Sequence, residues 1–271
     1  MSTPPWLTIR RGDAPLIVSI PHAGTEIPVD ILTRLVSPWL ARLDADWWVD
    51  QLYAFADRLD ATVIATGLSR TVIDVNRDPS GASLYPGMAT TGLCPLETFD
   101  GDPLYRPGHA PGAAEIAERR TQYFDPYHAA LAAEIERLGE NRRLLALYDA
   151  HSIRSHVNRL FVGELPQFNI GTNEGRSCDS ALTARVEAVC DASGLPRVTN
   201  GRFRGGYITR HYGAPGAGVH ALQMELACRG YMTEPDALTP TTWPAPFDPA
   251  FAAPMARILE DVLRACVAFV S

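Results

Sequence analysis

The chain has 271 residues, of which 46% are hydrophobic and 20% are charged, and its formal net charge is −7. This composition is that of a folded, mildly acidic protein with a well-buried core, and it argues against a disordered chain and against a nucleic-acid partner. Lysine is absent, so all 24 basic residues are arginines, whose planar guanidinium groups suit carboxylate binding.

The amino-terminal segment and the cysteines indicate a cytoplasmic protein. Residues 1–11 carry Pro4, Pro5 and charged residues where a secretory signal needs an apolar run, and no apolar stretch is long enough to span a membrane. The five cysteines are scattered and form no CxxC pair, which favours reduced thiols. We therefore expect a cytoplasmic location and no membrane partner.

Short runs rich in β-branched and aliphatic residues predict the strands of the chain. These runs are residues 16–20, 61–66, 71–75, 143–148 and 219–226, with a short extended piece at 205–209. Between them, residues 79–112 are rich in proline and glycine and predict a long irregular excursion of the kind that covers functional sites.

Apolar residues at helical spacing predict the helices. These segments are residues 44–60, 113–138, 177–192 and 250–270. Alternation of strands and helices without an internal repeat predicts one α/β domain over residues 1–271. Its central sheet should be mainly parallel or mixed, with helices on both faces.

Polar side chains stand at the carboxyl ends of four of the predicted strands. In chain order these are His22, Asn76 with Arg77, His151 and Glu225. An open α/β sheet gathers such residues in one crevice beyond the ends of its strands. The sequence therefore predicts that these side chains converge on one site.

Two histidines and one carboxylate are a common ligand set for a catalytic zinc ion, so His22 and His151 predict a site for Zn²⁺ or another divalent metal such as Co²⁺. The spacing leaves the carboxylate open. Glu26 lies four residues after His22, but Pro28 disfavours a helical turn there. Asp46 lies at the start of a predicted helix that Asp44 is expected to cap. The competing interpretation is that both histidines only stabilise loops through hydrogen bonds.

Seven segments, spread in order over nearly the whole chain, carry a further signal. They are Ser19–Gly24 (SIPHAG), Asp44–Trp47 (DADW), Ser69–Arg77 (SRTVIDVNR), Thr91–Leu93 (TGL), Asp149–Arg154 (DAHSIR), Asn200–Gly213 (NGRFRGGYITRHYG) and Gln223–Leu226 (QMEL). Together they resemble the N-formylglutamate amidohydrolase, or deformylase, family. The block at 200–213 is the hardest to obtain by chance.

The resemblance implies a hydrolase that converts N-formyl-L-glutamate to formate and L-glutamate in histidine degradation. It also implies a fold similar to that of zinc carboxypeptidases, which bind zinc through two histidines and an acidic residue. By that likeness His22 and His151 are metal ligands. Because the DADW segment belongs to the resemblance, it favours Asp46 as the acidic ligand over the competing Glu26.

The same likeness implies roles for the remaining polar residues. Glu225 would be the general base, Arg70 would stabilise the oxyanion, and Asn76 with Arg77 would clamp a substrate carboxylate. A dianionic substrate needs a second cation, which we expect from Arg204 or Arg210. Tyr207 could donate a further hydrogen bond, although the whole block around Gly205 and Gly206 could also be a solvated basic turn.

Two other functions fit the same residues. One is a metal-dependent amidohydrolase or carboxypeptidase-like enzyme that acts on a different N-acyl acidic amino acid, because the metal site does not choose the acyl group. The other is a non-catalytic protein that binds a metal or a small ligand. A carboxylate base such as Glu225 serves turnover rather than binding, so its presence favours an enzyme with a small-molecule substrate.

Overall fold

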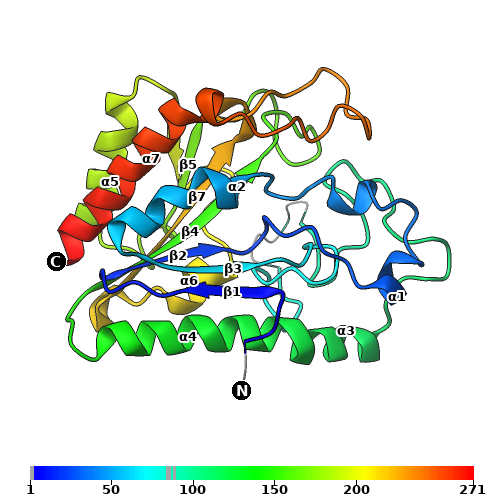
Figure 1. Ribbon diagram of the computed structural model, residues 1–271, viewed down its shortest axis with the longest axis horizontal. Coiled ribbons are helices and arrows are strands. Elements are labelled where there is room, and N and C mark those ends of the chain that lie inside the picture. The colour runs from blue at the N-terminus through cyan, green and yellow to red at the C-terminus, as the bar shows by residue number, and fades with distance from the viewer. Residues whose placement is uncertain (1–2, 84–86, 88–89) are drawn as a thin grey trace.

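The computed structural model describes residues 3–83, 87 and 90–271, which contain one seven-stranded sheet with helices on both of its faces (Figure 1). The strands lie in the order β1-β3-β2-β4-β7-β5-β6. Their bounds are β1 Leu7–Arg10, β2 Leu16–Ile20, β3 Thr62–Thr66, β4 Leu145–Ile153, β5 Phe168–Gly171, β6 Arg197–Thr199 and β7 Val219–Ala227.

The sheet is mixed, with a parallel centre. Strands β3, β2, β4 and β7 run parallel to one another, and β6 runs parallel to β5. Strand β1 pairs with β3 and β5 pairs with β7 in the antiparallel sense. The predicted α/β architecture is confirmed, although the three short strands β1, β5 and β6 were not expected from the sequence.

Helices cover both faces of the sheet. The α-helices are α1 Val29–Leu32, α2 Val49–Leu52, α3 Ala113–Arg119, α4 Asp125–Gly139, α5 Ser180–Ala192, α6 Tyr207–Tyr212 and α7 Pro249–Val270. A π-helical segment, η3 Arg120–Phe124, joins α3 to α4, and the 3₁₀ segments are η1 Leu40–Arg42, η2 Ala54–Leu59, η4 Pro215–Ala217 and η5 Cys228–Gly230. Figure 1 shows α5 and α7 on one side of the sheet and α3 and α4 on the other. Within the described residues, no helix is long and apolar enough to cross a membrane.

Strand alternation explains why one face of the sheet can hold a site. Successive side chains of a strand point to opposite faces. On the face toward α4, strand β4 presents Leu145 and Leu147 to the core and then turns polar at Asp149 and His151. Strand β7 follows the same pattern, with Ala221 in that core before Gln223 and Glu225.

The register brings these polar positions side by side. Ser19 of β2 pairs with Asp149, Asp149 with Gln223, and His151 with Glu225. All five side chains are buried. The carboxyl ends of three neighbouring strands therefore carry one continuous band of buried polar side chains.

The predicted helix over 44–60 is wrong as a single element. Trp48 adopts a left-handed backbone with φ of 64°, which interrupts the helix before α2, and η2 is a 3₁₀ segment. Asp44 does not cap α2, because its carboxylate accepts the N–H of Phe99 at 2.7 Å. The apolar residues over 44–60 therefore belong to a turn followed by two short helical segments, α2 and η2, rather than to one long helix.

The predicted strand over 71–75 is also wrong, because these residues form turns and irregular backbone. The hydroxyls of Ser69 and Thr71 both donate to the carbonyl of Ala41, at 2.9 and 2.8 Å, and the N–H of Thr71 donates to Ser69 Oγ at 3.2 Å. Such side-chain bonds to the backbone compete with strand pairing. They override the β-branched composition of the segment.

The piece at 205–209, expected to be extended, instead enters helix α6. Gly205 adopts a φ of 106°, which redirects the chain, and Asn76 accepts the first N–H groups of the helix. The distances are 3.2 Å from Tyr207 N to the Asn76 carbonyl and 2.8 Å from Ile208 N to Asn76 Oδ1. Contacts from a distant segment therefore decide this local structure.

The other predicted elements are close to those observed. The helical period over 113–138 corresponds to α3, η3 and α4, and the segments 177–192 and 250–270 correspond to α5 and α7. In the excursion over 79–112 the described residues form no helix and no named strand, while residues 84–86 and 88–89 lie outside the described part. All five cysteines are buried and unpaired.

Candidate functional site

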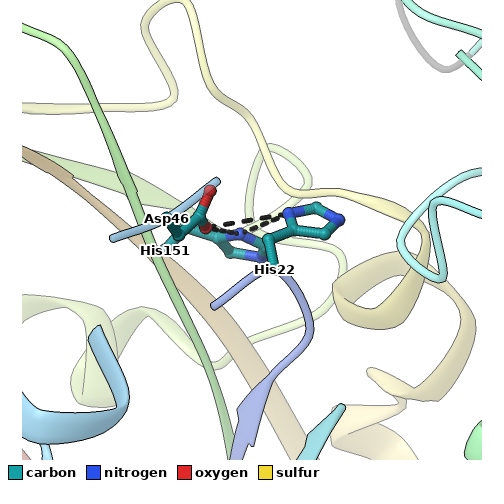
Figure 2. Close-up of side chains that lie close together, drawn as sticks. All are labelled: His22, Asp46 and His151. Carbon is teal, nitrogen blue, oxygen red and sulfur yellow. Dashed lines mark hydrogen bonds and ion pairs between the residues drawn. The ribbon is translucent and has the colours of Figure 1, made fainter. Parts of the chain in front are cut away.

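Three buried side chains from distant parts of the chain meet at the carboxyl end of the sheet. Figure 2 shows His22, Asp46 and His151 pointing toward one another. The two Nδ1 atoms are 3.2 Å apart, and Asp46 Oδ2 lies 2.9 Å from His151 Nδ1 and 3.7 Å from His22 Nδ1. Each of the three residues offers one donor atom to a common point.

The geometry of this cluster fits a divalent metal. Donors about 2.0–2.2 Å from a tetrahedral zinc ion lie roughly 3.3–3.6 Å from one another. The three separations in the structure, between 2.9 and 3.7 Å, surround that value. The donor set of two imidazoles and one carboxylate is a zinc-type set, so both chemistry and spacing suit the ion.

Each histidine is oriented by a carboxylate at its outer nitrogen. His22 Nε2 lies 2.7 Å from Asp74 Oδ1, and His151 Nε2 lies 3.0 Å from Asp149 Oδ2. A carboxylate at the outer nitrogen holds the proton there and leaves the inner nitrogen free to bind a metal. The two Nδ1 atoms are therefore the ones presented to a metal.

Local backbone contacts bring the three donors together. His22 follows β2 by two residues, and its carbonyl accepts the N–H of Asp46 at 3.0 Å. His151 lies within β4, where the adjacent Ser152 N donates to Asp46 Oδ2 at 3.3 Å. The turn that interrupts the predicted helix over 44–60 is what carries Asp46 to the histidines.

Glu26, the competing carboxylate, lies elsewhere. Its backbone is extended rather than helical and forms an isolated bridge with Leu68, and its side chain is exposed. The structure therefore brings Asp46 to the two histidines and leaves Glu26 outside the cluster.

Glu225 stands next to this cluster. It pairs in register with His151, and Gln223 Nε2 donates to its Oε2 at 3.0 Å. Burial raises the pKa of the Glu225 carboxyl to about 7, and the nearby His151 opposes that rise. A carboxyl with a pKa near neutrality exchanges protons readily at physiological pH, as a general base must.

Arg70 also lies beside the cluster. The side chain is buried, its Nη2 donates to Asp74 Oδ2 at 2.7 Å, and its Nη1 lies 3.5 Å from Asp46 Oδ1. Its Nε has no hydrogen-bond partner among the described residues. The guanidinium also lies 4.8 Å from the ring centre of Phe99. Arg70 is thus a fixed cation beside the cluster of His22, Asp46 and His151, and its Nε–H remains available as a hydrogen-bond donor.

A cavity opens over these residues. His22, His151, Glu225, Arg70 and Gln223 all line it. Its other described lining residues are Asn76, Arg77, Thr90, Thr91, Thr98, Phe99, Ile153, Arg159, Leu160, Arg202, Phe203 and Gly206. Four arginines in one lining suit an anionic ligand.

The predicted clamp residues are placed unequally. Arg77 lines the cavity, where Thr91 Oγ1 accepts from its Nη2 at 3.1 Å. Asn76 also lines it, but its amide is engaged: Nδ2 donates to Asp149 Oδ2 at 2.9 Å and contacts His151 Nε2 at 2.8 Å, while Oδ1 receives the N–H of Ile208.

Arg204, Arg210 and Tyr207 do not appear among the described lining residues of the cavity. Arg204 pairs with Glu174 at 2.8 Å, Arg210 Nε donates to the Gly205 carbonyl at 2.8 Å, and Tyr207 stacks on His211. Arg159 and Arg202, which were not predicted from the sequence, are the further arginines that line the cavity.

Gly206, which lines the cavity, packs too closely against Asn76 to admit a larger residue. A Cβ at this position would lie 2.5 Å from Asn76 Nδ2 and Oδ1, whose hydrogen bonds prevent the amide from turning away. Gly206→Ala should therefore lower the free energy of unfolding by about 1–3 kcal/mol, measured by urea titration. Gly216→Ala is the control, because its Cβ meets none of the described atoms within 4 Å, and a change above about 0.5 kcal/mol is not expected there. Equal stability of the two variants would contradict the prediction.

Comparison with known proteins gives consistent matches. A family model described as N-formylglutamate amidohydrolase matches residues 14–232. Two proteins named N-formylglutamate deformylase are similar: one from Pseudomonas aeruginosa is 47% identical over 95% of this chain and 93% of its own length, and one from Pseudomonas putida is 44% identical over 97% and 96%. The crystal structure of N-formylglutamate amidohydrolase from Ralstonia eutropha JMP134 superposes with a TM-score of 0.79 at 26% identity, covering 97% of both chains.

Proposed function

Because the chain belongs to the N-formylglutamate amidohydrolase family, we propose that it is a zinc-dependent hydrolase that cleaves N-formyl-L-glutamate to formate and L-glutamate. The observation that carries the proposal is the cluster of His22, Asp46 and His151 beside Glu225 and Arg70, in a cavity lined by further arginines. The names of the two Pseudomonas relatives support the substrate.

His22, Asp46 and His151 would hold the zinc ion. When bound, the ion would act as a Lewis acid that polarises the formyl carbonyl and makes a water molecule more acidic. The residues around it divide the remaining work. Glu225 takes the proton from the attacking water and later delivers it to the leaving nitrogen of glutamate, so that the base of the first step is the acid of the second.

Arg70 is placed to stabilise the negative charge that develops on the formyl oxygen. Its guanidinium is buried and held by Asp74, so it needs no rearrangement during the reaction, and fixed donors of this kind contribute most in sites that exclude water. Its unpaired Nε marks a donor that a bound group could use.

Arg77, with Asn76 beside it, is proposed to bind one carboxylate of the substrate. The second carboxylate needs another cation. We assign it to Arg159 and Arg202, because these line the cavity where Arg204 and Arg210 do not. An arginine pairs with a carboxylate through two parallel hydrogen bonds, which gives both affinity and orientation.

Replacing Arg70 by alanine should lower kcat/KM by about 10²- to 10³-fold, the usual loss when one donor to an oxyanion is removed. Zinc content, measured by atomic emission, should not change. Arg264→Ala removes an exposed arginine of α7 and should keep full activity. An Arg70→Ala enzyme as active as the Arg264→Ala control would remove Arg70 from the mechanism.

The substrate is tested by comparing kcat/KM for formyl-, acetyl- and peptidyl-glutamate, and for N-formyl-glutamine. We expect the formyl compound to be preferred, and we expect the amide to react more slowly because it leaves one cationic site unpaired. A preference for acetyl- or peptidyl-glutamate would instead support an amidohydrolase of different acyl specificity. Residues 1–271 as one catalytic domain, a cytoplasmic location and a role in histidine degradation remain predictions.

A further inference from the structure

Asp74 is a fully buried carboxylate that touches three parts of the proposed machinery at once. Its Oδ1 lies 2.7 Å from His22 Nε2 and accepts the N–H of Asn76 at 2.9 Å. Its Oδ2 accepts from Arg70 Nη2 at 2.7 Å and lies 3.5 Å from Arg77 Nε. One oxygen therefore faces a metal ligand, and the other faces the two arginines.

Through these contacts, the Asp74 side chain can influence both metal binding and the positions of the two arginines. The position of Oδ1 fixes the ring of His22, and a carboxylate behind a ligating histidine governs how tightly the metal is held. The position of Oδ2 fixes the guanidinium of Arg70 through a hydrogen bond and attracts that of Arg77 through an ion pair. Because the carboxylate is rigid, a displacement of one oxygen also displaces the other.

We propose that Asp74 is a positioning residue that acts on both His22 and the arginines. It thereby sets the affinity of the site for the metal and the affinity of the cavity for an anionic substrate. The inference rests on the proposed function for the identity of that substrate. It predicts that metal binding and the binding of the product L-glutamate are positively coupled, each strengthening the other by the same factor.

Asp149 provides a matched comparison inside the same site. It is equally buried and lies behind the other histidine, with Oδ2 3.0 Å from His151 Nε2. Its remaining contacts are with Ser19 Oγ at 3.0 Å and Asn76 Nδ2 at 2.9 Å. No hydrogen bond or ion pair joins it to an arginine of the described chain, so it supports the metal ligand without touching the arginine side of the cavity.

The experiment compares Asp74→Asn with Asp149→Asn. Zinc affinity is measured by competition with a chelator, and kcat and KM are then measured at saturating zinc. Both variants should lose about 10- to 100-fold in zinc affinity. With the metal restored, Asp74→Asn should also show a KM raised about tenfold and a lower kcat, because it releases Arg77 and Arg70, whereas Asp149→Asn reaches the substrate only through Asn76 and should change KM and kcat much less.

A double substitution tests whether Asp74 acts on the substrate through Arg77. Arg77→Ala alone should raise KM and leave zinc affinity unchanged. If Asp74 acts through that arginine, Asp74→Asn combined with Arg77→Ala should have the KM of Arg77→Ala alone. A KM that is the product of the two separate effects would overturn the inference, as would equal kcat and KM for the zinc-saturated Asp74→Asn and Asp149→Asn enzymes.

Folding and function are separated by two further measurements. Circular dichroism and urea unfolding establish that the variants are folded, and if Asp74→Asn is not, Asp74→Glu against Asp149→Glu replaces it, with the same pattern expected because the longer side chain displaces both oxygens. If the unsubstituted protein does not hydrolyse N-formyl-L-glutamate, the proposed function fails by itself. Calorimetric titration of zinc and L-glutamate into the same variants then still decides the role of Asp74, since an unaltered glutamate affinity in zinc-loaded Asp74→Asn overturns it.

Discussion

Replacing Glu225 by glutamine is expected to lower kcat by about 10²- to 10⁴-fold, the range that a positioned general base contributes. Glutamine has the shape of glutamate but does not accept the proton of water. The carboxyl is buried beside His151 and is held by Gln223, so the substitution should leave the cavity intact. The measurement is the steady-state rate with N-formyl-L-glutamate at saturating zinc.

Two controls give this result its meaning. Zinc content and urea stability should match those of the unsubstituted enzyme, and Glu260→Gln in α7, a residue that does not line the cavity, should retain full activity. Full activity of Glu225→Gln would exclude Glu225 as the base. If neither the variant nor the unsubstituted protein turns over any N-acyl amino acid while both bind zinc, the protein is a binding protein rather than an enzyme.

Removal of the metal should have the second large effect. Dialysis against a chelator is expected to lower the rate by about 10³-fold or more, because a Lewis acid supplies several kcal/mol of transition-state stabilisation. Added Zn²⁺ should restore the rate, and Co²⁺ should restore it at least in part. The melting temperature should rise with added zinc, because an ion bound only by the folded state stabilises it.

The ligand residues give the matched test of this effect. His151→Ala should lose both zinc and activity, and added zinc should not restore the rate. His156→Ala changes an exposed histidine five positions further along the chain and should behave like the unsubstituted enzyme. Activity that survives complete removal of the metal would exclude the proposed metal dependence.

The predictable part of the fold came from elements whose pattern is set by burial. The runs that became β2, β3, β4 and β7 are apolar because helices cover both faces of the sheet, and α7 shows its period because one side packs on the core. These patterns are local in the sequence. They therefore survive without knowledge of the tertiary structure.

The mispredicted elements depend on partners that lie far away in the chain. Residues 71–75 have a strand-like composition. The hydroxyls of Ser69 and Thr71 nevertheless donate to the carbonyl of Ala41, and these bonds stabilise a turn instead of a strand. Helix α6 begins where it does because Asn76 accepts its first N–H groups. Neither partner is visible in a local pattern.

The same distinction applies to the site. Strand ends and the family resemblance pointed to His22, His151 and Glu225, and the register of β4 and β7 places the last two side by side. The spacing left the choice between Asp46 and Glu26 open and only the family resemblance favoured Asp46, because the position of Asp46 depends on the bond from its N–H to the His22 carbonyl. Arg159 and Arg202 were missed because their places in the cavity depend on contacts between distant segments, such as the bonds from Arg159 to the Thr98 carbonyl and from Arg202 to the Leu160 carbonyl.

Asn76 has a consequence for how the molecule unfolds. Its amide contacts His151 and Asp149, while its oxygen receives an N–H from Ile208, which is 132 positions away in the chain. Helix α6 is therefore not expected to unfold separately while the protein remains active, because its detachment would remove a support from His151, a proposed metal ligand. In a denaturant titration, catalysis and the amide-exchange protection of α6 should disappear in one transition.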